Sequence, residues 1–129
     1  TEVVEVRRAL EVEAARLAAR RRTAEDLAAL DAALADREAA WASGRVAEFA
    51  AADAALHTVI VAAAHNTMLA DLYTSMSTAI RHSLAEALGP DLTPDRHVDH
   101  TRLVDAIRAG DAARAAREAS AFLESPHGA

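Results

Sequence analysis

The sequence has no cysteine and few aromatic residues: one tryptophan, one tyrosine and two phenylalanines among 129 residues. Without cysteine, the chain can form neither disulfide bonds nor thiolate metal sites. Hydrophobic residues make up 52% of the chain, and many of them are alanine. Because alanine favours helices and lets them pack closely, we expect a thin helical core built from Leu, Val, Ile and Ala.

Long apolar runs are also missing. No run approaches the roughly 20 residues that cross a bilayer, and the first residues show no signal-peptide pattern. We therefore expect a cytoplasmic protein that does not contact a membrane. The chain has 14 basic and 20 acidic residues and a net charge of −6. This balance argues against direct nucleic-acid binding, which needs a basic surface.

The usual sequence signatures of enzymes are missing too. There is no nucleophile elbow, no glycine loop that would cradle a phosphate, and no pair of Glu-x-x-His motifs of the di-iron type. We therefore predict that the chain is not an enzyme. A small metal-dependent hydrolase is the remaining enzymatic alternative, but no residue stands out as its general base.

The few glycines and prolines separate segments that favour helices. Thr23, Asn66, Thr93 and Asp111 each stand where a helix N-cap is expected. No segment alternates with a period of two, so no strand is expected. The chain is predicted to be one all-α domain, 1–129, folded as an antiparallel bundle of about six helices. The expected helices are residues 2–22, 24–43, 46–64, 67–88, 94–109 and 112–125. The apolar stripe of the fourth is Leu69, Leu72, Met76, Ile80 and Leu84.

Asp53 and His57 form the sharpest local feature. They are four residues apart, so they share one face of a helix and could hold one metal ion together. A helix-surface pair that binds nothing is the common alternative. Phe49 and Ile60 lie close to the same face, which indicates that the pair is turned partly inward. A buried polar pair needs a partner, and a metal, a ligand or an arginine would each serve.

His97 and His100 form a second candidate cluster on the expected helix 94–109. Their spacing of three places them on nearby faces. Leu103 and Ile107 follow His100 at helical spacing, so its surroundings are expected to be core. A core histidine with no ligand role is the alternative. His65 and His82 have no comparable partners in the sequence.

Several segments together resemble one family, the C-terminal effector-binding (FCD) domain of the FadR branch of GntR-type bacterial transcription regulators. The similar segments follow one another in the family's order and cover nearly the whole chain: residues 5–18, 23–27, 49–57, 63–66 and 100–115. The resemblance implies a helical bundle with a central ligand pocket, paired into a homodimer. It also implies a DNA-binding winged helix-turn-helix domain, absent from this chain, on the N-terminal side. The pocket of such domains senses small carboxylates, and one branch senses fatty acyl-CoA.

The resemblance also implies a divalent metal, zinc or similar, held by one Asp and three His. The matching positions are Asp53, His57 and His100, and the fourth, 22 residues after His100, is Phe122. Phenylalanine cannot ligate, and its ring would fill the space of an imidazole. Two alternatives follow: a metal site weakened by one ligand, or a metal-free site in which Asp53 and the histidines bind the effector directly. His82 is a further candidate for the missing ligand.

Two arginines are candidates for binding a carboxylate effector, together with Asp53, His57 and His100. Arg7 matches an arginine on the first helix of the family, and its charge suits a carboxylate. The alternative for Arg7 is a surface ion pair with Glu11, four residues further on. Arg81 is a weaker candidate of the same kind. We therefore predict an effector-binding regulatory domain, and the alternative function is a structural dimerisation bundle with a vestigial pocket.

Overall fold

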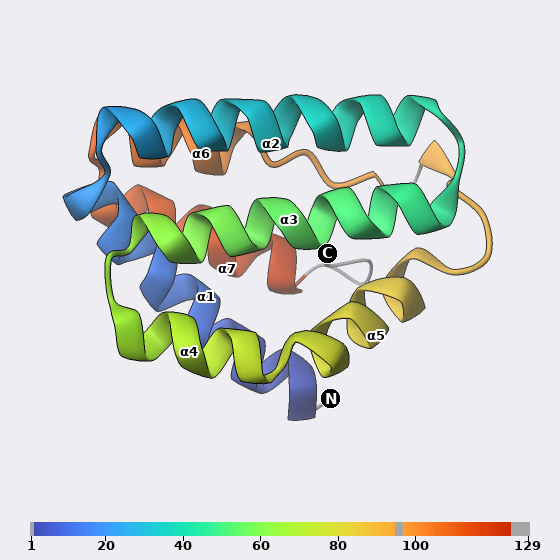
Figure 1. Ribbon diagram of the computed structural model, residues 1–129, viewed down its shortest axis with the longest axis horizontal. Helices are drawn as coiled ribbons and strands as arrows, with labels where there is room; N and C mark the ends of the chain where they lie inside the picture. The colour runs from blue at the N-terminus through green and yellow to red at the C-terminus, as the bar shows by residue number, and fades with distance from the viewer. Residues whose placement is uncertain (1, 95–96, 125–129) are drawn as a thin grey trace.

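The computed structural model describes residues 2–94 and 97–124, and these fold into seven helices with no strand. In Figure 1, α3 lies in the middle with α2 above it and α4 and α5 below, while α1 and α7 pass behind. The prediction of an all-α bundle is confirmed. The helices are α1 (Glu2–Arg21), α2 (Ala24–Ala42), α3 (Val46–Ala63), α4 (Thr67–Ser75), α5 (Ser77–Leu88), α6 (Thr101–Ala109) and α7 (Ala112–Glu124).

Three helices begin where short polar side chains in the sequence predict a start. Thr23 Oγ1 accepts a hydrogen bond from the backbone N–H of Asp26, and the Asp26 carboxylate accepts one from the N–H of Thr23, forming a capping box before α2. Asn66 caps α4 by accepting from the N–H of Leu69 at 3.0 Å. Asp111 caps α7 by accepting from the N–H of Arg114, also at 3.0 Å. These bonds satisfy backbone donors that have no partner within their own helix.

The expected single helix 67–88 is wrong, because the chain breaks at Met76 into α4 and α5. The Ser75 hydroxyl donates to the carbonyl of Leu72 at 2.6 Å, a local bond of the kind that competes with helical hydrogen bonds. The expected apolar stripe is also wrong at one residue. Leu72, expected in the apolar stripe, is 52% exposed, and Tyr73 is buried in its place.

The expected helix 94–109 is also wrong over its first part. Residues 97–100 are not helical, and α6 begins only at Thr101. The Asp99 carboxylate accepts hydrogen bonds from the N–H and the hydroxyl of Thr101. His97 and His100 therefore do not share a helix face. His100 is instead the residue before α6, and its side chain is turned into the core.

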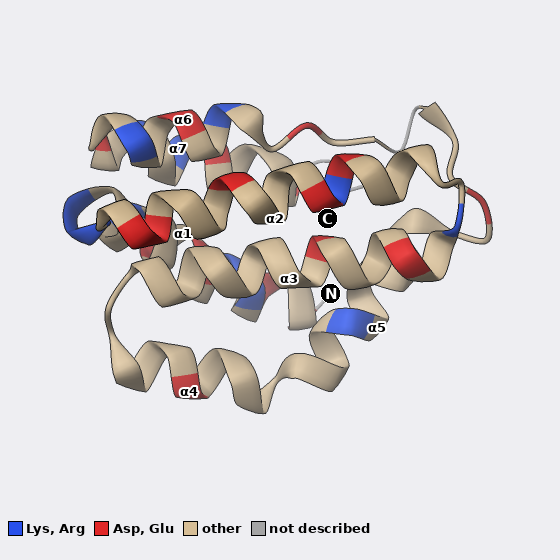
Figure 2. Cartoon of the chain, turned by 45° about the horizontal axis from the view of Figure 1, so that its top comes forward, with Lys and Arg blue, Asp and Glu red and all other residues tan. Residues whose placement is uncertain are grey.

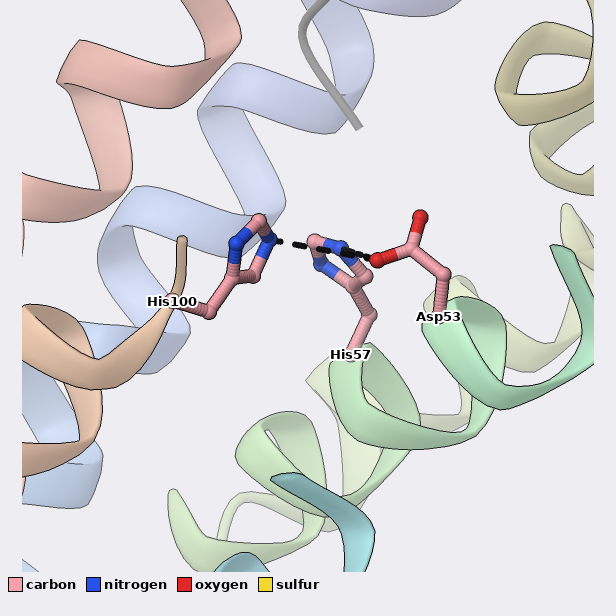
Figure 3. Close-up of side chains that lie close together, drawn as sticks. All are labelled: Asp53, His57 and His100. Carbon is pink, nitrogen blue, oxygen red and sulfur yellow. Dashed lines mark ion pairs between the residues drawn. The ribbon is translucent and has the colours of Figure 1, made fainter. Parts of the chain in front are cut away.

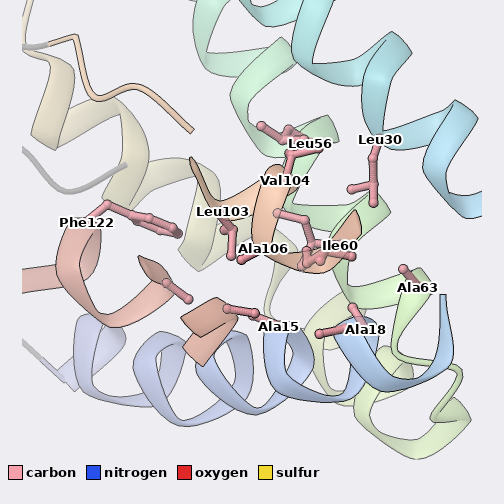
Figure 4. Close-up of a cluster of buried hydrophobic side chains, with 14 of the residues drawn as sticks. Ala15, Ala18, Leu30, Leu56, Ile60, Ala63, Leu103, Val104, Ala106 and Phe122 are labelled. Carbon is pink, nitrogen blue, oxygen red and sulfur yellow. The ribbon is translucent and has the colours of Figure 1, made fainter. Parts of the chain in front are cut away.

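The core consists of two apolar clusters that share α1 and α3. One joins α1, α2, α3, α6 and α7 (Figure 4), and the other joins α1, α3, α4 and α5. Alanines at α1 and α3 let these helices approach closely. By length and composition α3 alone among the described helices could cross a membrane. In this structure it packs against α1, α2, α4 and α5 and carries buried polar side chains, as a core helix does.

Gly110 allows a test of one close contact in this fold. Gly44 and Gly110 both have φ = +73°, but a Cβ on Gly110 would lie 3.1 Å from Arg22 Nη2, whereas one on Gly44 would meet nothing within 4 Å. Alanine should cost about 1 kcal/mol at either position through the backbone alone. We expect Gly110→Ala to cost more than Gly44→Ala in urea denaturation, because Arg22 must also move. Equal losses in both variants would show that the Arg22 contact is unimportant.

Candidate effector and metal site

Asp53, His57 and His100 meet in the interior, although they come from two distant parts of the chain. Asp53 and His57 lie one turn apart on α3, and His100 approaches from the residue before α6 (Figure 3). The Nε2 atoms of His57 and His100 lie 3.5 and 3.9 Å from Asp53 Oδ1. One ligand atom from each residue lies within 4.8 Å of the others, and all three side chains are buried. The structure thus brings together the three residues singled out in the sequence.

Both histidines are held by their Nδ1 atoms. His57 Nδ1 lies 2.5 Å from Glu11 Oε1, and His100 Nδ1 lies 2.9 Å from the carbonyl oxygen of Val98. Acceptors at these positions favour Nδ1–H on each ring, which turns Nε2 towards Asp53. Metal-binding histidines are oriented in this way by a second hydrogen bond.

Two buried arginines extend the cluster into a network of charged side chains. Arg7 Nε donates to Glu11 Oε2 at 2.8 Å, and Arg37 Nε donates to Asp53 Oδ1 at 2.8 Å. With the contact between Glu11 and His57, these pairs link α1, α3 and α2. Each arginine is fully buried, so the Arg7–Glu11 pair anticipated from the sequence exists but is not on the surface.

The charges in this network of side chains set the pKa values of its members. Burial alone would raise the pKa of Asp53, but the charges of His57, Arg37 and His100 hold it well below its usual value. Burial would likewise lower the pKa of His57, but Glu11 and Asp53 outweigh it and raise the pKa to about 9. Burial lowers the pKa of His100 to about 3, with help from the charges of Arg37 and His57. At neutral pH His57 is therefore protonated and His100 is neutral, so a metal would have to displace a proton from His57.

The cluster has several polar atoms whose hydrogen-bonding capacity is unused. Among the described residues, no hydrogen-bond partner exists for Asp53 Oδ2, His57 Nε2, Tyr73 Oη, or the Nη1 and Nη2 atoms of Arg7 and Arg37. A buried polar atom without a partner costs about 1–3 kcal/mol. The interior of the bundle therefore contains several buried polar atoms with unused hydrogen-bonding capacity.

The residues present fit a divalent metal ion. Asp53 Oδ2 and His57 Nε2 have no hydrogen-bond partner among the described residues, and the three donors are the oxygen and nitrogen ligands that zinc accepts. Their spread of up to 4.8 Å is wider than the roughly 3.4 Å between ligands of a tetrahedral zinc site. Small side-chain rotations would therefore be needed to close the shell. The buried group could hold a metal.

Phe122 on α7 lies against both histidines. Its ring is stacked on that of His100 with centroids 4.4 Å apart, and it meets His57 edge-on at 5.5 Å. The side chain that the resemblance places at the fourth ligand position therefore contacts the candidate metal ligands His57 and His100 but offers no donor atom. With three protein ligands, a metal here would keep at least one position for water or an effector oxygen.

The other predicted residues lie away from this cluster. Arg81 is exposed and lines a cavity of about 700 Å³ between α3 and α5, formed largely by alanines of α3. His82, a candidate fourth ligand, is 76% exposed and pairs with Glu86 on the surface. His97 contacts Glu38 and the ring of Trp41. The structure thus joins Arg7 to Asp53, His57 and His100, but not Arg81 or His82.

Sequence reasoning missed Arg37 and Tyr73, and it named Glu11 only as a surface partner of Arg7. A signal for Arg37 was available: it follows Leu30 by seven residues and Leu34 by three, which places it on the apolar stripe of α2. Tyr73 lines the cavity between α3 and α5 and is nearly buried. Burial and the charge of Glu11 raise the pKa of its hydroxyl.

The chain is thus an all-helical bundle with a buried cluster of charged groups, several of whose atoms have no hydrogen-bond partner among the described residues. The family model described as the FCD domain matches residues 2–125. The chain therefore belongs to the FCD family, the C-terminal effector-binding domain of GntR-type regulators, as the sequence resemblance predicts. Domains of this family are regulatory and bind ligands rather than catalyse reactions. No curated protein shows a significant match to the chain.

Proposed function

We propose that this domain binds a small carboxylate metabolite in its interior and thereby controls a transcription regulator. The observation that carries the proposal is that the buried Arg7 and Arg37, which pair with Glu11 and Asp53, have Nη1 and Nη2 atoms with no hydrogen-bond partner among the described residues. A carboxylate offers two oxygens in the geometry that a guanidinium recognises. Arg81 lines the cavity between α3 and α5 and would be a second contact for an effector carboxylate.

A divalent metal such as zinc would be held by Asp53, His57 and His100. It would supply a positive centre that an effector carboxylate could reach through the open coordination positions. Its affinity should be low for an FCD domain, because Phe122 replaces the fourth ligand.

The regulatory part of the proposal is a change in DNA binding. Effector binding would shift the placement of two DNA-binding domains in a homodimer. DNA would be contacted only by an N-terminal domain outside this chain, in the cytoplasm.

The candidate surface for the homodimer contact is on α4. Figure 2 shows that α4 carries little charge. Met68 and Leu72 on α4 are 75% and 52% exposed, and exposed apolar side chains of this size suit a contact with a second copy.

The test is a thermal-shift screen on the purified domain, after chelation and again with added zinc, against acetate, lactate, gluconate, succinate and an amino acid. A ligand that binds only the folded state raises the melting temperature, by an amount equivalent to about 2.7 kcal/mol at 100 times its Kd. We expect one chemical class of acid to stand out, with sedimentation velocity on the same samples showing a dimer.

The second candidate function is a structural dimerisation bundle with a vestigial pocket. The contact of Phe122 with both histidine rings favours it, as does the location of the 700 Å³ cavity away from the charged cluster. A screen in which neither acids nor metals move the melting curve, while the protein remains dimeric, would support this function over the sensor.

A further inference from the structure

Arg37 is placed where a residue of the apolar core is expected. It lies on the inward face of α2, is fully buried, and its guanidinium carbon stands 4.7 Å from the centre of the Phe49 ring. Its Nε donates to Asp53 Oδ1 at 2.8 Å. Stacking and this hydrogen bond fix the plane and direction of the guanidinium, so the group is held in place before any ligand arrives.

The outer end of this guanidinium is buried and has unused hydrogen-bonding capacity. Nη1 and Nη2 have no hydrogen-bond partner among the described residues. The nearest acid besides Asp53 is Glu38, whose Oε1 is 3.7 Å from Nη1, beyond hydrogen-bond distance, on a side chain that is 48% exposed. Because Nε is already used, Nη1 and Nη2 form a fork that can donate to both oxygens of one carboxylate.

The charge of Arg37 also bears on the metal. Asp53 Oδ1 accepts from Arg37 at 2.8 Å and lies 3.5 and 3.9 Å from the Nε2 atoms of His57 and His100. A divalent cation bound to these three residues would therefore sit close to a fixed positive charge, which opposes its binding. Arg37 therefore already supplies the positive charge beside Asp53 that a bound metal would otherwise supply.

We propose that Arg37 is an effector-binding residue that takes the carboxylate of the effector through Nη1 and Nη2, so that effector binding does not require the metal. This inference rests on the proposed function, in which the interior cluster binds a carboxylate. It goes beyond that proposal by naming the residue that binds the carboxylate. It also assigns Arg37 opposite effects on two affinities: Arg37 strengthens binding of the acid and weakens binding of the metal.

The experiment compares wild type, Arg37→Met and Arg37→Lys by isothermal titration with two probes: zinc alone, and the screened acid that gives the largest thermal shift. Arg45→Met is the control, because Arg45 is 73% exposed and pairs with Glu48 three residues away. Circular dichroism and the melting temperature show whether each variant is folded. The acid titration of wild type is done with and without chelator, and this arm needs no variant.

We expect chelated wild type to bind the acid with an affinity within about threefold of that of the zinc-loaded protein. Arg37→Met should weaken acid binding at least about tenfold and tighten zinc binding about tenfold, because it removes a carboxylate donor and a repelling charge. Arg37→Lys keeps the charge but not the fork, so acid binding should weaken while zinc binding stays as in wild type.

Two results would overturn the inference while leaving the proposed function intact: acid binding that is lost on chelation of wild type, or acid binding that is unchanged in a folded Arg37→Met. A fall in both acid and zinc affinity in Arg37→Met would also overturn it, because that is the result of general damage to the site. Failure of every acid to bind wild type, with or without zinc, would instead remove the proposed function, and this inference with it.

Discussion

Replacing Phe122 with histidine should tighten zinc binding at least about a hundredfold, because it adds a fourth ligand to Asp53, His57 and His100 and completes a tetrahedral shell. The Phe122 ring already lies 4.4 Å from that of His100 and 5.5 Å from that of His57, measured between centroids, so an imidazole there starts within reach. Affinity would be measured by competition with a chelating dye. At saturating zinc the gain corresponds to about 2.7 kcal/mol of added stability.

The control for this prediction is Phe122→Leu, which removes the ring without adding a donor. Its zinc affinity should match that of wild type. If Phe122→His binds zinc no more tightly than Phe122→Leu, the three residues do not form a metal site that a fourth ligand can complete. If Phe122→His raises the zinc affinity only when Arg37→Met is also present, the charge of Arg37 limits zinc binding more than the lack of a fourth ligand does.

Replacing Glu11 with alanine should cost about 3–5 kcal/mol of folding stability, the range for breaking a buried ion pair. Glu11 is 4% exposed and contacts both Arg7 Nε and His57 Nδ1, at 2.8 and 2.5 Å. Its loss leaves the Arg7 guanidinium buried with no hydrogen-bond partner among the described residues. Because domains of this size are stable by only about 5–15 kcal/mol, urea denaturation should show a variant near its stability limit.

Glu13→Ala is the matched control for Glu11→Ala. Glu13 lies on the same helix and pairs with Arg16, but both side chains are partly exposed, at 43% and 34%, so the cost should stay below about 1 kcal/mol. The double variant Arg7→Met, Glu11→Leu should recover much of the lost folding stability, because it removes both members of the Arg7–Glu11 pair and leaves neither charge unpaired. Equal costs for Glu11→Ala and Glu13→Ala would contradict the buried ion pair that the structure shows.

The ends of most helices were predictable because the signals that set them are local. Thr23, Asn66 and Asp111 each cap a helix through a side chain that bonds a backbone N–H three residues away. Gly110 ends α6 in the left-handed conformation that glycine adopts at little cost. Such interactions involve only neighbouring residues, so they can be read without knowledge of the fold.

The two failures of helix prediction have tertiary or competing local causes. The helix breaks at Met76, where the Ser75 hydroxyl bonds the Leu72 carbonyl, and Ile80 and Leu84 of α5 pack in the same apolar cluster as Leu69 and Tyr73 of α4. Residues 97–100 give up helical hydrogen bonds, and His100 is instead buried against Phe122. In both places packing against distant helices outweighs a helical preference of a few tenths of a kcal/mol per residue.

The abundance of alanine, the absence of any alternation with a period of two and the positions of the few glycines and prolines determined by themselves that this chain is a helical bundle. Residue spacing also paired Asp53 with His57, because both lie on one helix. Only the tertiary structure decided that Glu11 holds His57 and that Arg37 holds Asp53. Those contacts join residues 46 and 16 positions apart, and the packing of α1 and α2 against α3 brings them within hydrogen-bond distance.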